Sequence, residues 1–228
     1  MTFEELQKKT GIIFKDAELL KLAFIHRSHL NEDKRMHESN ERLEFLGDSV
    51  LSLLTSQYLY RTYPEYPEGT LTNIRSSLVK TTSLSDISKS LGLGELLFLS
   101  HGEESSGGRT NPSLLADVFD AFLGAIYLDP GLDAAEKFLG KYLFPNAAGI
   151  IASKSYIDYK SLLQELIQQD SRISPTYHVI KSEGPDHARI FWVEARTAGR
   201  ILGAGSGKSK QEAEQRAAMA SLEKMGKI

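Results

Sequence analysis

The chain has 228 residues, 41% hydrophobic and 25% charged, which is long enough for one large or two ordinary domains and excludes a disordered or fibrous protein. It has no cysteine, which excludes disulfide scaffolds, thiol nucleophiles and metal sites built on sulfur. The formal net charge is -3, and the charge is unevenly distributed along the chain. Residues 153–228 carry 12 basic against 9 acidic side chains, while the preceding part is acidic. The C-terminal part therefore suits a polyanionic partner.

The N-terminus, MTFEELQKKT, lacks the basic start and apolar stretch of a signal peptide. No run approaches the roughly 18 apolar residues that a membrane-spanning helix needs. We therefore expect a cytoplasmic protein with no membrane partner.

From Phe3 to about Ala148 the apolar residues recur mainly at helical spacing, with Pro and Gly at the breaks. This pattern predicts an all-α domain over residues 1–148, with five to eight helices. The segment FPNAAGIIASK that follows is short and made mostly of small residues. It marks a domain boundary, with the linker at 149–155.

The pattern then changes to helix, strands, helix, and predicts a small α+β domain over residues 156–226. An amphipathic helix is expected first, then strands in which apolar and polar residues alternate. Ser209, followed three residues later by Glu212, predicts a capping box that opens the last helix. The expected elements are a helix at 159–168, strands at 176–181, 189–197 and about 200–203, and a helix from 209 to 225.

Acidic residues lie on one stripe of an expected helix in NERLEFLGDSVL, residues 40–51. At about 100° per residue, Glu41, Glu44 and Asp48 fall within roughly 60° of one another. A solvated polar face is the ordinary interpretation of such a stripe. Gly47, however, sits in the same helix at a cost of about 1 kcal/mol relative to Ala, which indicates a close backbone approach.

A second acidic pair lies in SLLADVFDAFLGAIYLD, where Asp117 and Asp120 are three residues apart in a strongly apolar helix. Buried acids are costly unless they pair with Arg or Lys or bind a metal. Carboxylates without His or Cys at ligand spacing favour Mg²⁺ or Mn²⁺. We therefore expect a metal site, which could activate water and neutralise charge on a phosphate.

These two segments resemble the signature motifs of the ribonuclease III family. YPEGTLTNIRSSLV at 66–79 and GGRTNPSLLAD at 107–117 also resemble that family, in the same order, and the C-terminal part resembles a double-stranded-RNA-binding domain. The resemblance implies an all-α endonuclease domain followed by a small α-β-β-β-α RNA-binding domain. It covers nearly the whole chain.

The resemblance also implies a homodimeric endoribonuclease that hydrolyses double-stranded RNA, such as ribosomal RNA precursors and mRNA, with Mg²⁺ or Mn²⁺. The expected products have 5′-phosphate ends and short 3′ overhangs. Matched by position, Asp48 and Asp120 are the implied catalytic pair. The implied metal ligands are Glu44, Asp117 and Asp120, with Glu41 and Glu68 as supporting acids.

Among the acidic residues, one departs from the family pattern, which has Glu where this chain has Asp120. Asp is one methylene shorter, and Mg²⁺ tolerates poor geometry badly. We expect retained but cation-sensitive activity. The alternative is a non-catalytic double-stranded-RNA-binding protein, and cleavage tests separate the two.

A second alternative is a helical metal phosphohydrolase or a di-iron bundle. These would need paired histidine ligands or Glu-x-x-His motifs, and the histidines of the N-terminal part supply neither.

Double-stranded RNA is recognised mostly by its shape, across two minor grooves and the phosphates between them. The resemblance implies three contact regions: Gln164 and Glu165 in the first, Pro185 and His187 in the second, and Lys208 and Lys210 in the third. In the third region Lys210 is followed by Gln211, where the family has a second lysine. We therefore expect salt-sensitive binding.

Overall fold

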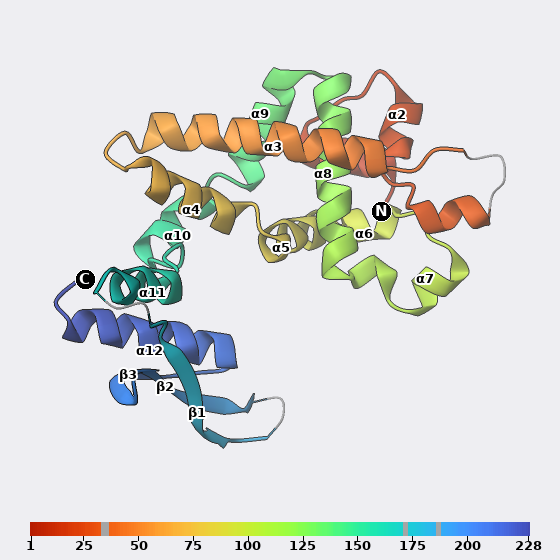
Figure 1. Ribbon diagram of the computed structural model, residues 1–228. Coiled ribbons are helices and arrows are strands. Elements are labelled where there is room, and N and C mark those ends of the chain that lie inside the picture. The colour runs from red at the N-terminus through yellow and green to blue at the C-terminus, as the bar shows by residue number, and fades with distance from the viewer. Residues whose placement is uncertain (33–36, 171–172, 186–187) are drawn as a thin grey trace. The chain divides into compact units, whose positions relative to one another are not determined.

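The computed structural model describes residues 1–32, 37–170, 173–185 and 188–228. The chain forms two compact units, Met1–Tyr156 and Ile157–Ile228 (Figure 1). Within the described residues, no helix has both the length and the apolar composition needed to cross a lipid bilayer.

The first unit is all-helical, which confirms the predicted class. Its described residues contain ten α-helices, more than the five to eight expected, because very short helices such as the four-residue α6 carry too little periodicity to be recognised. The elements are α1 (Phe3–Thr10), α2 (Ala17–Leu22), the 3-10 helix η1 (Arg27–Asn31), α3 (Glu41–Thr62), α4 (Glu68–Leu78), α5 (Thr81–Leu91), α6 (Leu93–Leu96), α7 (His101–Ser105), the 3-10 helix η2 (Gly108–Thr110), α8 (Pro112–Leu128), α9 (Leu132–Tyr142) and α10 (Asn146–Ala152).

The core of this unit surrounds α8, which α3 crosses (Figure 1). Most of the α8 side chains are buried, so the helix is apolar around nearly all of its circumference, as expected of a central core helix. Phe119 and Phe122 are fully buried, and both rings contact Phe138 of α9. An acidic residue on α8 is therefore held rigidly and partly removed from water.

The second unit has the predicted α-β-β-β-α order. It consists of α11 (Tyr159–Asp170), β1 (Thr176–Glu183), β2 (Ile190–Thr197), β3 (Arg200–Gly207) and α12 (Lys210–Lys224), with the strands antiparallel in the order β1-β2-β3. Val193 and Ala195 of β2 are buried with Leu163 of α11 and Ala217 of α12. One face of the sheet thus forms a small core with the two helices.

Several details differ from the sequence-based expectation. Helix α10 includes the first residues of the linker expected at 149–155, and β1 extends to Glu183. Strand β3 continues to Gly207 rather than ending near Gly203. The added residues pair with β2, where Gly207 lies opposite Phe191. The glycine also lets α12 pack closely, since a Cβ at Gly207 would lie 2.7 Å from the backbone nitrogen of Ala213. The predicted capping box is only half formed, since Ser209 Oγ accepts from the Glu212 N–H at 3.1 Å, whereas the Glu212 carboxylate accepts from the N–H of Lys208.

Candidate active site

The acidic segments meet where the backbones of α3 and α8 touch. A Cβ built on Gly47 would overlap the carbonyl oxygen of Asp120 and lie 3.0 Å from the backbone nitrogen of Gly124. A Cβ built on Gly124 would likewise overlap the carbonyl oxygen of Leu43. The close approach inferred from Gly47 is confirmed, and a glycine on each helix makes it possible.

This crossing brings five predicted site residues into one electrostatic cluster. Burial raises the pKa of the Glu44 carboxyl, and the neighbouring Asp117, Glu41 and Asp48 raise it further. Burial also raises the pKa of Asp120, to about 8, with smaller contributions from Asp48, Glu44 and Asp117. The carboxylates of the two helices therefore act on one another, although they lie about 70 residues apart in the sequence.

Asp120 is the most constrained acid of this cluster. Its Oδ1 atom is buried and has no hydrogen-bond partner among the described residues. Within the described residues, neither Asp117 nor Asp120 forms the ion pair with Lys or Arg that was the alternative to metal binding. A buried carboxylate oxygen without a partner is costly unless a proton or a cation satisfies it.

The donor set fits a hard divalent cation. All members of the cluster are carboxylates, the oxygen ligands that Mg²⁺ and Mn²⁺ prefer, and the unpartnered Asp120 oxygen lies among them. In the part of the chain that the structure describes, no three acidic or histidine side chains already converge as a preassembled metal site. Mutual repulsion keeps like-charged carboxylates apart until protons or a cation neutralise them.

The raised pKa of Asp120 makes the metal-free protein sensitive to pH. The folded-state pKa of about 8 exceeds the ordinary value of 3.8, so the folded state binds the extra proton between these values. In EDTA, this carboxyl's contribution to the free energy of unfolding should be fully present below about pH 4 and lost as the pH rises through 8. Each unit of pKa difference corresponds to about 1.4 kcal/mol.

Urea titrations at pH 5 and pH 8 in EDTA, followed by the helical circular dichroism signal, measure this effect. Asp120→Asn should lose less stability than the wild type between the two pH values. An equal loss in both proteins would show that Asp120 does not carry a raised pKa.

Glu68, the other predicted supporting acid, is not brought to the cluster within one chain. It begins α4 and accepts a hydrogen bond from Thr72 Oγ1 at 2.9 Å. It also lines a cavity of about 780 Å³ between α3 and α4, together with Leu53, Tyr60 and Arg75. Glu41, in contrast, lies in the first turn of α3 and acts on Glu44.

The predicted RNA-binding residues lie on three separate parts of the second unit. Gln164 and Glu165 are exposed on α11, and Pro185 is exposed in the connection after β1. His187 lies outside the described residues. Lys208 and Lys210 are exposed at the start of α12, where the N–H of Lys208 already donates to the carboxylate of Glu212.

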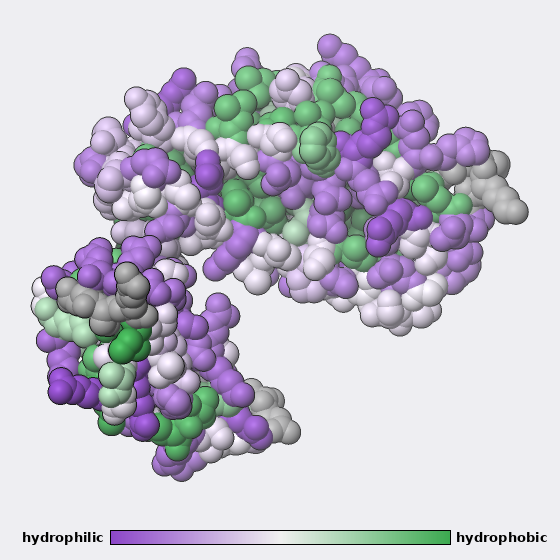
Figure 2. Space-filling model, in the orientation of Figure 1, coloured by the Kyte–Doolittle hydropathy of each residue, from purple (hydrophilic) through white to green (hydrophobic). Residues whose placement is uncertain are grey.

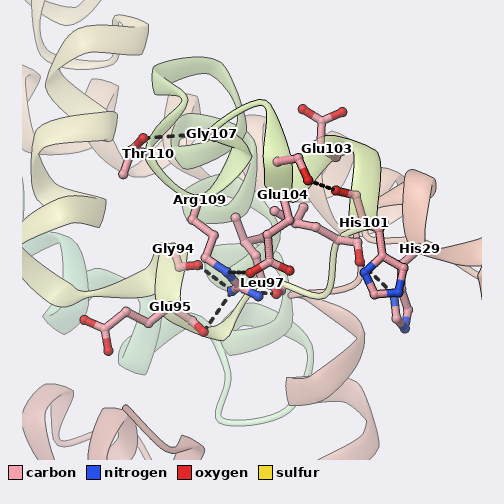
Figure 3. Close-up of polar contacts among 12 residues, drawn as sticks. His29, Gly94, Glu95, Leu97, His101, Glu103, Glu104, Gly107, Arg109 and Thr110 are labelled. Atoms are coloured by element: carbon pink, nitrogen blue, oxygen red, sulfur yellow. Dashed lines mark hydrogen bonds and ion pairs between the residues drawn. The ribbon is translucent and has the colours of Figure 1, made fainter.

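Arg109, which the sequence analysis did not predict as a site residue, fixes the segment before α8 through hydrogen bonds. Arg109 Nη1 donates to three backbone carbonyls, those of Gly94 at 3.1 Å, Glu95 at 3.1 Å and Leu97 at 2.9 Å, while its Nε donates to Glu104 at 2.7 Å (Figure 3). The bonds fix η2 immediately before the helix that carries Asp117 and Asp120. The motif GGRTNPS contains this arginine, but only the fold reveals its partners.

The chain is similar to known proteins over nearly its whole length. The family model described as Ribonuclease-III-like matches residues 16–147, and the model described as Double-stranded RNA binding motif matches residues 159–225. The curated protein Ribonuclease 3 of a Geobacillus species is 49% identical over 227 residues, with 99% of this chain and 92% of the relative covered. Ribonuclease 3 of Treponema denticola is 45% identical over 221 residues, with 97% and 90% covered.

Solved structures agree with these matches. The nuclease domain of ribonuclease III from Campylobacter jejuni superposes with a TM-score of 0.59 at 37% identity, covering 63% of this chain and 99% of that one. The description of that structure refers to a flexible region involved in dimer formation.

Proposed function

Since the chain belongs to the ribonuclease III family and is thus an endoribonuclease with a double-stranded-RNA-binding domain, we propose that it cuts both strands of duplex RNA at the crossing of α3 and α8. The products are duplex RNA fragments with 5′-phosphate ends and short 3′ overhangs. Cytoplasmic ribosomal RNA precursors and mRNA are the proposed natural substrates. The observation that carries the proposal is the buried, unpartnered Asp120 oxygen within a cluster of carboxylates from both helices.

Members of this family generally depend on a divalent metal. Here Glu44, Asp117 and Asp120 would hold Mg²⁺, or Mn²⁺ in its place, through carboxylate oxygens. When bound, the cation lowers the pKa of a water molecule and neutralises charge on the phosphate.

The chain's own groups complete the proposed catalytic site. Asp48 is exposed on α3 beside the cluster, so its carboxylate can accept a hydrogen bond from the attacking water and orient that water. The backbone of Asp120 is held by the close helix crossing, so α8 presents its carboxylate from a fixed position in the cluster. Asp48 and Asp120 thus form the proposed catalytic pair, with Glu41 and Glu68 in supporting positions.

The second unit is proposed to bring the RNA to this site. Lys208 and Lys210 supply positive charge to phosphates between the grooves, and Gln164 and Glu165 supply polar contacts to a minor groove. Pro185 and His187 complete the second contact region. The surplus of basic residues in 153–228 supports a polyanionic ligand.

A homodimer is proposed because α3 carries exposed apolar side chains, one of them beside its acidic stripe and others along the rest of the helix. Phe45 is 78% exposed, Tyr60 is 75% exposed and Leu53 is 59% exposed. Hydrophobic surface is visible among polar side chains on the face that α3 crosses (Figure 2). A two-fold interface places the same patch on both partners, so a protruding side chain on one can enter the cavity between α3 and α4 on the other.

The function is tested by incubating the purified full-length protein with a long perfect RNA duplex in Mg²⁺, in Mn²⁺ or in EDTA. Short duplex products with overhanging 3′ ends in either metal, and intact RNA in EDTA, are expected. An intact duplex in every buffer, combined with a shifted band on a native gel, would instead indicate a binding protein without catalytic activity.

Replacing Asp120 by glutamate should raise the cleavage rate at limiting Mg²⁺, by roughly tenfold, because the longer side chain brings its carboxylate closer to the cation. The rate is measured over a Mg²⁺ titration and again in Mn²⁺, where a smaller gain is expected. An unchanged or lower rate in Mg²⁺ would contradict the idea that Asp120 weakens the metal site.

A further inference from the structure

The segment 25–28, which leads into η1, is held by hydrogen bonds to two other segments. The N–H of His26 donates to the carbonyl of Phe98 at 3.1 Å, and the N–H of Asn40, which immediately precedes α3, donates to the carbonyl of Ile25 at 2.8 Å. Ser28 Oγ accepts from the N–H of Ser100 at 3.0 Å. The 3-10 helix η1 therefore has a defined position beside the first turn of α3.

His29, within η1, adds a fourth contact. His29 Nδ1 lies 3.1 Å from the carbonyl oxygen of Leu99, within hydrogen-bond distance. This contact connects η1 to the extended segment before α7, in which Arg109 also binds the carbonyl of Leu97 (Figure 3). A side chain carried by η1 is thus presented from a rigid support rather than from a loose loop.

Arg27, the first residue of η1, points its charge at the edge of the acidic cluster. Its Nη1 lies 3.7 Å from Glu41 Oε1, and the two side chains are 72% and 56% exposed. The other Glu41 oxygen accepts from Ser39 Oγ at 2.7 Å. Arg27 also favours the ionised form of Glu44, and His26 does so for Asp117, although burial prevails for both acids.

A single long ion pair between exposed side chains contributes little to folding. Among the described residues, this pair also leaves most of the five N–H donors of the Arg27 guanidinium open to another acceptor. A duplex RNA that approaches five carboxylates meets strong repulsion unless a cation stands beside them. An arginine fork suits a phosphate because it can donate two parallel hydrogen bonds to the phosphate oxygens.

We propose that Arg27 is a positioning residue that binds a backbone phosphate of the RNA strand being cut, at the Glu41 edge of the acidic cluster. This inference rests on the proposed function. It adds a contact from the nuclease unit itself, in addition to the contacts proposed for the second unit, and it places the RNA backbone along η1 and the first turn of α3.

The test compares Arg27→Gln and Arg27→Lys with the wild type in full-length protein on a long RNA duplex. Arg61→Gln is the matched control, because Arg61 is an exposed arginine in the last turn of α3, the helix that Glu41 begins, about 30 Å from Glu41 at 1.5 Å per residue. KM, kcat and the half-saturating Mg²⁺ concentration are measured at several KCl concentrations, and a thermal melt verifies folding.

Arg27→Gln should raise KM roughly fivefold or more with a smaller change in kcat. It should also reduce the slope of log kcat/KM against log salt by about 0.7 to 0.9, the value for one lost phosphate contact. Arg27→Lys should keep most of the slope but not all of the affinity, because lysine retains the charge without the fork. Arg61→Gln should behave as the wild type.

An unchanged KM and salt slope in Arg27→Gln would overturn the proposal. So would a change confined to the half-saturating Mg²⁺ concentration, since Arg27 would then act only through the acids. If the wild type itself fails to cut the duplex in either metal, the proposed function falls, an outcome distinct from a wild type that cuts and an Arg27 variant that matches it.

Discussion

Replacing Gly47 by alanine should destabilise the first unit by about 3 kcal/mol and remove most of the cleavage activity. The added methyl group would overlap the carbonyl oxygen of Asp120 and press on the backbone nitrogen of Gly124. Both obstacles are backbone atoms of α8, so no side-chain rotation relieves the clash. The two helices have to move apart, and the carboxylates that they carry move apart with them.

Chemical denaturation followed by helical circular dichroism measures the loss of stability, and cleavage of duplex RNA measures the loss of function. Gly140→Ala is the control, because a Cβ at Gly140 of α9 meets nothing within 4 Å. Since alanine favours a helix by up to about 1 kcal/mol over glycine, this variant should be slightly stabilised and fully active. A Gly47→Ala protein as stable and active as the wild type would contradict the tight crossing of α3 and α8.

Asp48→Asn should lower the cleavage rate by roughly 100-fold or more while leaving RNA binding and folding nearly unchanged. The amide has the shape of the carboxylate but lacks its negative charge, so it orients a nucleophilic water poorly. The side chain is exposed on α3. Loss of its charge also lessens the repulsion that raises the pKa of Asp120, so the metal-free protein should be no less stable.

Single-turnover cleavage at saturating Mg²⁺ and a native-gel titration of the same duplex distinguish catalysis from binding. Asp86→Asn provides the matched control, since Asp86 is exposed on α5, away from the cluster, and forms a surface ion pair with Lys89 at 3.5 Å. Comparable cleavage by wild type and Asp48→Asn would remove Asp48 from the proposed catalytic pair. A shared loss in Asp86→Asn would point to a general effect of charge.

Several features of this protein followed from local patterns in the sequence. Helical spacing of apolar residues gave the all-α class of the first unit, and alternation gave the strands of the second. Gly47 indicated a close approach, because a glycine in a helix interior is costly without one. The three-residue and four-residue spacings of the acids placed Glu44 with Asp48, and Asp117 with Asp120, on common helix faces.

Other features came only from contacts between distant segments. Periodicity could not show that α8 meets Gly47 at Asp120, that the Asp120 oxygen lacks a partner, or that Glu68 lies apart from the other acids at a cavity beside Tyr60. The place of Arg27 beside Glu41 depends on bonds from η1 to residues 98–100.

The division has a physical cause. Helix and strand periodicity, caps and glycine costs are set by residues within a few positions of one another, so the sequence by itself determines them. Burial, pKa shifts and unsatisfied atoms depend on which helix faces pack together, and that choice is made by the whole core. The acids were readable from the sequence, but the tertiary structure alone decided which of them lie together and that Arg27 lies beside Glu41.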